Sequence, residues 1–111
     1  RMIELALRGR VIEWRWEKKN GRNIKTLEGA MGQLDEMMGA HALDAEDIVH
    51  QIHMELVGNR LMLAPALRNE MLDALADCDT SLRRTIHSRI QIEHFLHCVS
   101  AAGQRHGLAM S

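Results

Sequence analysis

Two pairs of histidines have the spacing that places metal ligands on one face of a helix. They are His50 with His53, one turn after Glu46, and His94 with His97. Ligands of metal sites in helical bundles share a helix face in this way, and they point inward. By helical geometry, however, both pairs lie away from the apolar side of their own segments. We therefore predict solvent-exposed histidines and no metal site.

Arg89 and His94 form an Arg-x4-His pattern. In such a pattern the arginine could hold a phosphate while the histidine moves a proton during RNA cleavage. The six residues 89–94 resemble the motif of small, all-helical HEPN-type ribonucleases, which implies metal-free RNA cleavage at a dimer interface. Phe95 and Leu96 follow the histidine here, at a place where that family often has a tyrosine. A metal-free ribonuclease that uses Arg89 and His94 is therefore an alternative interpretation.

Other patterns that mark catalysis are missing from the sequence. It contains no glycine-rich phosphate loop and no serine in the context of a nucleophile elbow. Cys78 lies in an acidic stretch, which disfavours a reactive thiolate. We expect Cys78 and Cys98 to be small buried thiols in a reducing cytoplasm. The prediction is a protein that is not an enzyme, with no catalytic residues and no cofactor.

Charge is distributed unevenly along the chain. Residues 1–25 carry eight Lys or Arg and three Glu, a net charge of +5, whereas residues 26–111 carry six basic and twelve acidic residues, a net charge of −6. Both tryptophans lie in the basic segment. Tryptophan and arginine dominate the energetics of many protein interfaces. We therefore predict a partner-binding surface made of Trp14, Arg15, Trp16, Lys18, Lys19 and Arg22.

This basic segment could contact three kinds of surface. Its tryptophans could anchor it on the chain's own core or on a sister subunit, with the cations facing the acidic stretch 35–79. They could bind another protein, or stack on the bases of a nucleic acid whose phosphates the cations hold. Nucleic acid ranks below protein because the acidic body repels phosphates. The predicted function is a non-enzymatic protein-binding adaptor, chaperone-like protein, inhibitor or regulator, with a nucleic-acid-binding regulator as a further alternative.

The segment that carries this surface has the periodicity of a strand. Apolar and charged residues alternate from 12 to 17 and, in the same manner, from 3 to 8. Asn20-Gly21 follows, and this dipeptide is a strong signal for a two-residue hairpin turn. We favour an N-terminal β-hairpin, with a short helix over residues 1–18 as the alternative.

The rest of the chain has helical periodicity. Apolar residues recur every three or four positions over residues 27–38, 45–63 and 66–102. Asp44 is a suitable N-cap for the second of these segments. The third segment has no glycine or proline, and we expect either two helices that meet near residues 79–81 or one long helix. The predicted fold is mainly α, a small bundle of three or four helices.

A single domain of residues 1–111 accommodates all of these elements, with a basic arm or hairpin (1–25) before a helical body (26–111). No apolar run approaches the length of a membrane span. The apolar stripe of the C-terminal segment changes side, and the chain has eight methionines, which favours pairing with a second copy. We therefore expect a cytoplasmic homodimer.

Overall fold

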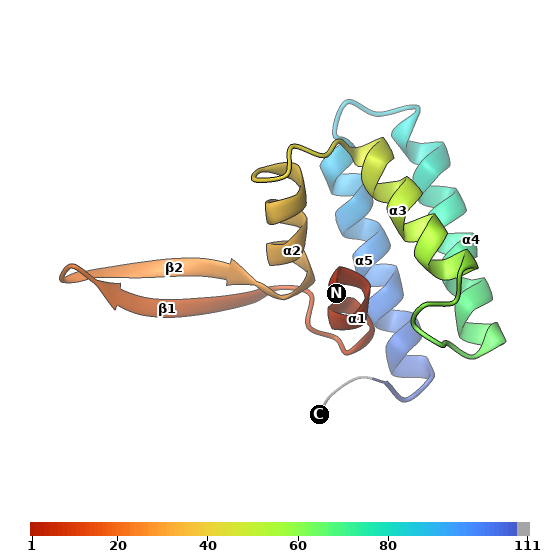
Figure 1. Ribbon diagram of the computed structural model, residues 1–111, viewed down its shortest axis with the longest axis horizontal. Helices are drawn as coiled ribbons and strands as arrows, with labels where there is room; N and C mark the ends of the chain where they lie inside the picture. The colour runs from red at the N-terminus through yellow and green to blue at the C-terminus, as the bar shows by residue number, and fades with distance from the viewer. Residues whose placement is uncertain (109–111) are drawn as a thin grey trace.

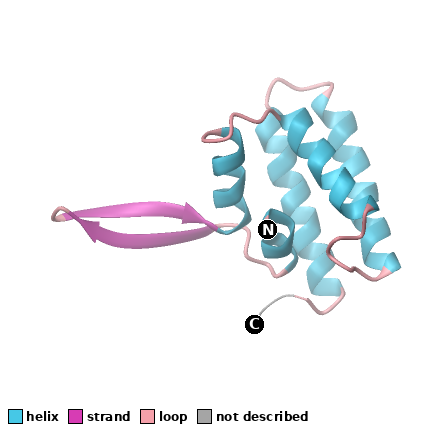
Figure 2. Ribbon diagram, viewed as in Figure 1, coloured by secondary structure: helices cyan, strands magenta, loops and turns pink. Residues whose placement is uncertain are grey.

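The computed structural model describes residues 1–108 and has two parts, a helical bundle and a β-hairpin that projects from it (Figures 1 and 2). Four longer helices form the bundle, and the N-terminal segment contains both a short helix and the hairpin, which confirms the predicted fold class. The elements are, in chain order, α1 (Met2–Leu7), β1 (Glu13–Lys19), β2 (Arg22–Glu28), α2 (Gly29–Met38), α3 (Ala45–Val57), α4 (Pro65–Leu82) and α5 (Ser88–Arg105).

Helix α5 supplies the centre of the hydrophobic core. It packs against α1 and α4, and more lightly against α3. The apolar stripe of this helix is therefore covered within one chain, so it no longer argues for a homodimer. Its buried side chains are Ile92, Phe95, Leu96, Val99 and Ala102.

Helix α1 corrects the interpretation of residues 3–8 as a strand. Five of its six residues are buried, because the helix sits between α2 and α5. A helix that is buried on nearly all sides lacks the usual spacing of three to four residues between apolar positions. The apparent alternation of Ile3, Leu5 and Leu7 therefore came from a helix with Glu4 as its one exposed interior position.

Helix α3 starts as predicted, with Asp44 as its cap. The backbone N–H of Asp47 donates to Asp44 Oδ1 at 2.8 Å, and the N–H of Asp44 donates to Asp47 Oδ2 at 3.2 Å, which completes a capping box. The helix ends at Gly58, before the predicted end at residue 63. Pro65 does not stop this helix but begins α4, where the missing N–H of a proline leaves no bond unmade.

Residues 66–102 form two helices and not one long helix, which confirms the first of the two predicted alternatives. The break lies at residues 83–87, and the cap-type residues 79–81 belong to the last turn of α4. The chain reverses there, so α4 and α5 pack side by side (Figure 1). Among the helices of residues 1–108, none has the length and apolarity needed to cross a membrane.

Candidate functional site

The hairpin extends away from the bundle at the N-terminal end of α2 (Figure 1). Its strands pair in the register Glu13 with Glu28 through Lys19 with Arg22. Asn20 and Gly21 form the turn, both with positive φ, 52° and 75°. A two-residue turn with two positive φ angles matches the right-handed twist of the strands, which explains the Asn-Gly sequence. The predicted turn is confirmed. The second strand, β2, extends to Glu28 and so includes the first two residues of the helical segment predicted over 27–38.

Backbone hydrogen bonds fix the base of the hairpin to the bundle. The N–H groups of Ala30 and Met31 donate to the carbonyls of Arg10 at 2.8 Å and Val11 at 2.9 Å. The first N–H groups of a helix have no acceptor within it, so α2 gains partners from the chain that leads into β1. Gly29 permits this approach, because it has φ +77° and an added Cβ would lie 2.7 Å from the Arg10 carbonyl oxygen.

Gly29→Ala should therefore destabilise the junction between hairpin and bundle. Both the positive φ and the contact with the Arg10 oxygen oppose a side chain, and we expect a loss of about 2 kcal/mol in the free energy of unfolding. Gly21→Ala is the matched control, because Gly21 has φ +75° but open space around it. Urea denaturation measures the free energy of unfolding of both variants, and the difference between their losses gives the cost of the contact with the Arg10 oxygen. Equal losses would show that only the backbone angle matters.

The strand register divides the hairpin into two faces, because paired residues project to the same side. One face, here called the aromatic face, consists of Trp14, Trp16, Lys18, Asn23, Lys25 and Leu27. The opposite face, here called the ionic face, consists of Glu13, Arg15, Glu17, Lys19, Arg22, Ile24, Thr26 and Glu28.

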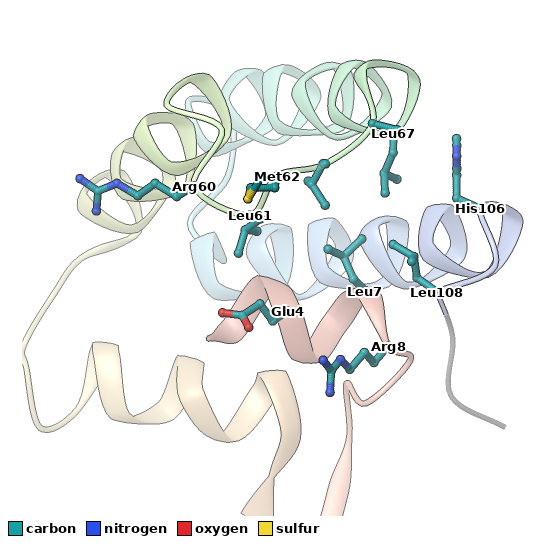
Figure 3. Close-up of a pocket in the computed structure, with 11 residues that line it drawn as sticks. Glu4, Leu7, Arg8, Arg60, Leu61, Met62, Leu67, His106 and Leu108 are labelled. Atoms are coloured by element: carbon teal, nitrogen blue, oxygen red, sulfur yellow. The ribbon is translucent and has the colours of Figure 1, made fainter.

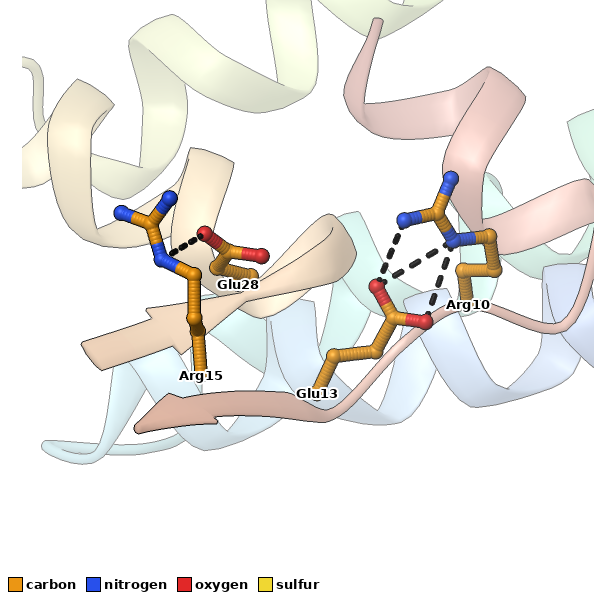
Figure 4. Close-up of polar contacts among 4 residues, drawn as sticks. All are labelled: Arg10, Glu13, Arg15 and Glu28. Atoms are coloured by element: carbon orange, nitrogen blue, oxygen red, sulfur yellow. Dashed lines mark hydrogen bonds and ion pairs between the residues drawn. The ribbon is translucent and has the colours of Figure 1, made fainter. Parts of the chain in front are cut away.

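At the base of the hairpin, the two acidic residues of the ionic face pair with arginines. Arg15 Nε lies 3.0 Å from Glu28 Oε1, and Arg10 Nη2 lies 2.9 Å from Glu13 Oε1 (Figure 4). The hydrogen bond from Arg10 holds the pKa of Glu13 below its ordinary value. The Arg10–Glu13 pair therefore stabilises the fold at pH values above the ordinary glutamate pKa. This stabilisation is lost as the pH falls through the lowered pKa of Glu13. Arg15, one of the predicted binding residues, is engaged in an ion pair.

The aromatic face leaves its tryptophans open to solvent. Trp14 is 49% exposed and Trp16 is 65% exposed. Lys25 Nζ lies 4.0 Å from the centroid of the Trp14 ring and 5.7 Å from that of Trp16, in cation–π geometry. The tryptophans are not anchored in the chain's own core, so the prediction that they anchor the basic segment there is wrong, whereas docking on a sister subunit stays a prediction.

Four cations surround the end of the hairpin, and residues 18–25 contain no carboxylate. Within the described part of the chain, Lys18, Lys19 and Arg22 take part in no ion pair. The expectation that the basic segment faces the acidic stretch 35–79 is therefore wrong within one chain. The projecting hairpin instead combines a free basic tip with exposed indole rings.

Lys25 belongs to the aromatic face and was absent from the predicted set. The signal for it was available in the sequence. A two-residue turn at Asn20-Gly21 pairs residue 19 with residue 22, and by extension residue 16 with residue 25. Arg15, Lys19 and Arg22 of the predicted set lie on the ionic face instead, so the structure divides the predicted residues between two sides.

Arg89 and His94, the pair of the ribonuclease alternative, contact different groups within the chain. Arg89 forms ion pairs with Asp35 of α2 at 2.5 Å and with Glu93 at 2.9 Å, and these partners raise its pKa. His94 lies on the side of α5 toward α4, with its Nε2 3.5 Å from Cys98 Sγ. The guanidinium and the imidazole therefore meet different neighbours, with the guanidinium held by carboxylates.

All four histidines of the two pairs are exposed, as predicted. Among residues 1–108, no group of three or more His, Cys, Asp or Glu is arranged to hold a metal ion. Both thiols are free. Cys78 is buried as expected, and burial raises its pKa to about 11, with Asp79 adding to the effect. Cys98 is only half-buried.

Two of the surface grooves of the bundle are lined by residues from helices far apart in the sequence, which local patterns could not predict. The first, between α1, the loop before α4 and the end of α5, has leucines inside and charged residues at its rim (Figure 3). Leu7, Leu67 and Leu108 belong to its lining, and Glu4 and Arg8 to its rim. The second groove lies between α3 and α4, on residues of both helices.

The described residues form a small helical bundle with a projecting hairpin. Residues 19–98 match the family model described as the replication factor C C-terminal domain, and the chain belongs to this family. The family mediates protein–protein assembly, which indicates a protein partner in general terms. The matched region begins at the end of β1, so it does not include Trp14 or Trp16. Neither the curated proteins nor the solved structures contain a match to this chain.

Proposed function

We propose that this chain is a non-enzymatic domain that binds another protein through the aromatic face of its hairpin. The observation that carries the proposal is the pair of exposed tryptophans on one side of a hairpin that backbone bonds hold away from the bundle. Membership of a family whose domains mediate protein assembly supports a protein partner. Within this proposal the chain acts as an adaptor or regulator.

The composition of the aromatic face supports a protein partner with an acidic surface. Indole rings bury a large apolar area when covered, and exposed tryptophans become the dominant residues of many interfaces. Lys18 and Lys25 flank the rings and would pair with carboxylates at the edge of the contact. We place this activity in the cytoplasm, where two free thiols such as Cys78 and Cys98 are ordinary.

A capture experiment with matched faces tests the proposal. The full chain is immobilised and exposed to a lysate of its native cells, and retained proteins are identified. The variant Trp14→Ser with Lys18→Glu should lose the retained protein, because both changes lie on the aromatic face. Its control, Lys19→Glu with Ile24→Ser, makes the same change of charge on the ionic face. It should weaken retention through that charge but not abolish it, because both indole rings remain.

Thermal unfolding accompanies both variants. The melting temperature should stay close to that of the wild type, because the four side chains are all exposed. If both variants lose the retained protein to the same extent, binding depends on the positive charge of the hairpin and not on its aromatic face. A large fall in melting temperature for Trp14→Ser with Lys18→Glu alone would instead give the indole a role in folding.

A further inference from the structure

We propose that the aromatic face of one copy docks in the groove between α3 and α4 of a second copy. The proposal rests on the proposed function and names its partner, a second copy of this chain. Three features carry it: the shape and lining of the groove, the opposite charges of the two surfaces, and their positions on the molecule.

The α3–α4 groove has an apolar floor and an acidic rim. Val49 and Leu75 are buried in its floor, with Leu72 and Ala76 beside them. Its volume of about 490 Å³ is in the range of clefts that hold compact groups. Glu46 and Asp79, from the two different helices, are its more exposed lining residues, together with His50 and His53, and Arg83 pairs with Asp79. An apolar floor suits an indole ring, and the carboxylates suit the lysines beside it.

The charges of the two surfaces are complementary. With histidines neutral, α3 and α4 together carry seven Asp or Glu against Arg68 alone, a net charge of −6. Arg83 pairs with Asp79 and Arg105 pairs with Glu70, so five of these acids take part in no ion pair among the described residues. Residues 18–25 of the hairpin carry four cations and no acid. Opposite potentials of this kind bring two surfaces together and set their orientation. The acidic residues are Glu46, Asp47, Glu55, Glu70, Asp73, Asp77 and Asp79.

The two surfaces lie at opposite ends of the molecule, so they can meet only between copies. Figure 1 shows the hairpin extending from α2 in the direction away from α3 and α4. Its base is attached to α2 by the bonds from Ala30 and Met31 and by the close approach at Gly29, which orient the hairpin in this direction. A contact between two different patches is head-to-tail, and it can continue to further copies.

A single-stranded nucleic acid is the competing occupant of the aromatic face. The acidic surface of α3 and α4 would repel its phosphates, whereas the same surface attracts the hairpin of a second copy. The observations therefore favour the second copy, and an oligonucleotide serves as a competitor in the test.

Sedimentation equilibrium of the full chain over a wide concentration range tests the docking. The wild type should gain mass with concentration, and this gain should weaken as salt is raised, because the contact pairs exposed charges. Trp14→Ala with Trp16→Ala should weaken association at least about 30-fold, the effect of losing interface-dominating residues. Glu46→Lys with Asp79→Lys should weaken it similarly. Ala76→Lys, at an exposed groove position, provides a second groove variant if the charge reversal impairs folding.

Mixing the tryptophan variant with the groove variant gives the decisive result. Each alone should be monomeric, but the groove variant keeps a native hairpin and the tryptophan variant keeps a native groove. An equimolar mixture should therefore form a heterodimer that does not grow further. Failure of the mixture to associate would overturn the docking of hairpin in groove, as would wild-type association that survives removal of both tryptophans.

Two other outcomes separate this inference from the proposed function. A wild type that stays monomeric, yet retains a different lysate protein through its tryptophans, would end the self-docking and leave the proposed function standing. Binding of a single-stranded oligonucleotide in place of self-association, lost with the tryptophans and steeply weakened by salt, would overturn both.

Discussion

Gly103→Ala is expected to lower the free energy of unfolding by at least about 2 kcal/mol, because the added methyl group cannot be accommodated. A Cβ at this position of α5 would collide with the carbonyl oxygen of Leu7 and would lie 2.9 Å from its carbonyl carbon. Both atoms belong to the backbone of α1, so relief requires α1 to move away from α5. Leu7 and its neighbours would then lose their place in the core.

Helix propensity alone gives the opposite sign, which makes this variant informative. Alanine is favoured over glycine inside a helix by about 1 kcal/mol, so a free α5 would be stabilised. Urea denaturation followed by far-ultraviolet circular dichroism measures the difference. Ala101→Gly, at the exposed position two residues earlier, is the control and should cost only the propensity term. A stabilised Gly103→Ala protein would mean that α1 does not pack on α5 as described.

Trp14→Ala with Trp16→Ala is expected to weaken binding of the protein partner at least about 30-fold, which corresponds to the loss of about 2 kcal/mol typical of the dominant residues of an interface. Both rings are half-exposed or more in the free chain, so they contribute little to its folding. Removal of the cation–π contacts with Lys25 should cost the fold no more than about 1 kcal/mol. Binding and stability should therefore separate.

Isothermal titration with the captured partner gives the affinity, and chemical denaturation gives the stability. Lys19→Ala with Ile24→Ala removes two exposed side chains from the ionic face and leaves both indole rings, so it should change the affinity only a few-fold. The account fails here if the two double variants lose affinity to the same extent, because binding would then have no preferred face.

Local signals in the sequence were sufficient for several elements. Asn20-Gly21 predicted the turn because few other dipeptides adopt two positive φ angles easily. Asp44 predicted the start of α3 because a capping side chain bonds to residues a few positions away. The helical periodicity of their segments predicted that the histidine pairs are exposed. Each of these outcomes depends on residues within a few positions of one another.

Features that depend on distant parts of the chain could not be predicted. The burial of α1 comes from its place between α2 and α5, which removed the periodicity that would have identified it. The direction of the hairpin depends on bonds from α2 to Arg10 and Val11, and the exposure of Trp14 and Trp16 follows from that direction. Alternating tryptophans look the same in a sequence whether they face a core or solvent.

Tryptophan fluorescence of the unmodified chain is the most direct test of the central claim. Trp14 and Trp16 are the only tryptophans, and the chain has no tyrosine, so the emission reports on the aromatic face alone. In the dilute chain, acrylamide should quench both indoles readily, as their exposure requires. Addition of a partner without tryptophan, or concentration of the chain itself, should reduce the quenching and shift the emission to shorter wavelength. A partner that binds while quenching and emission stay unchanged would contradict the account.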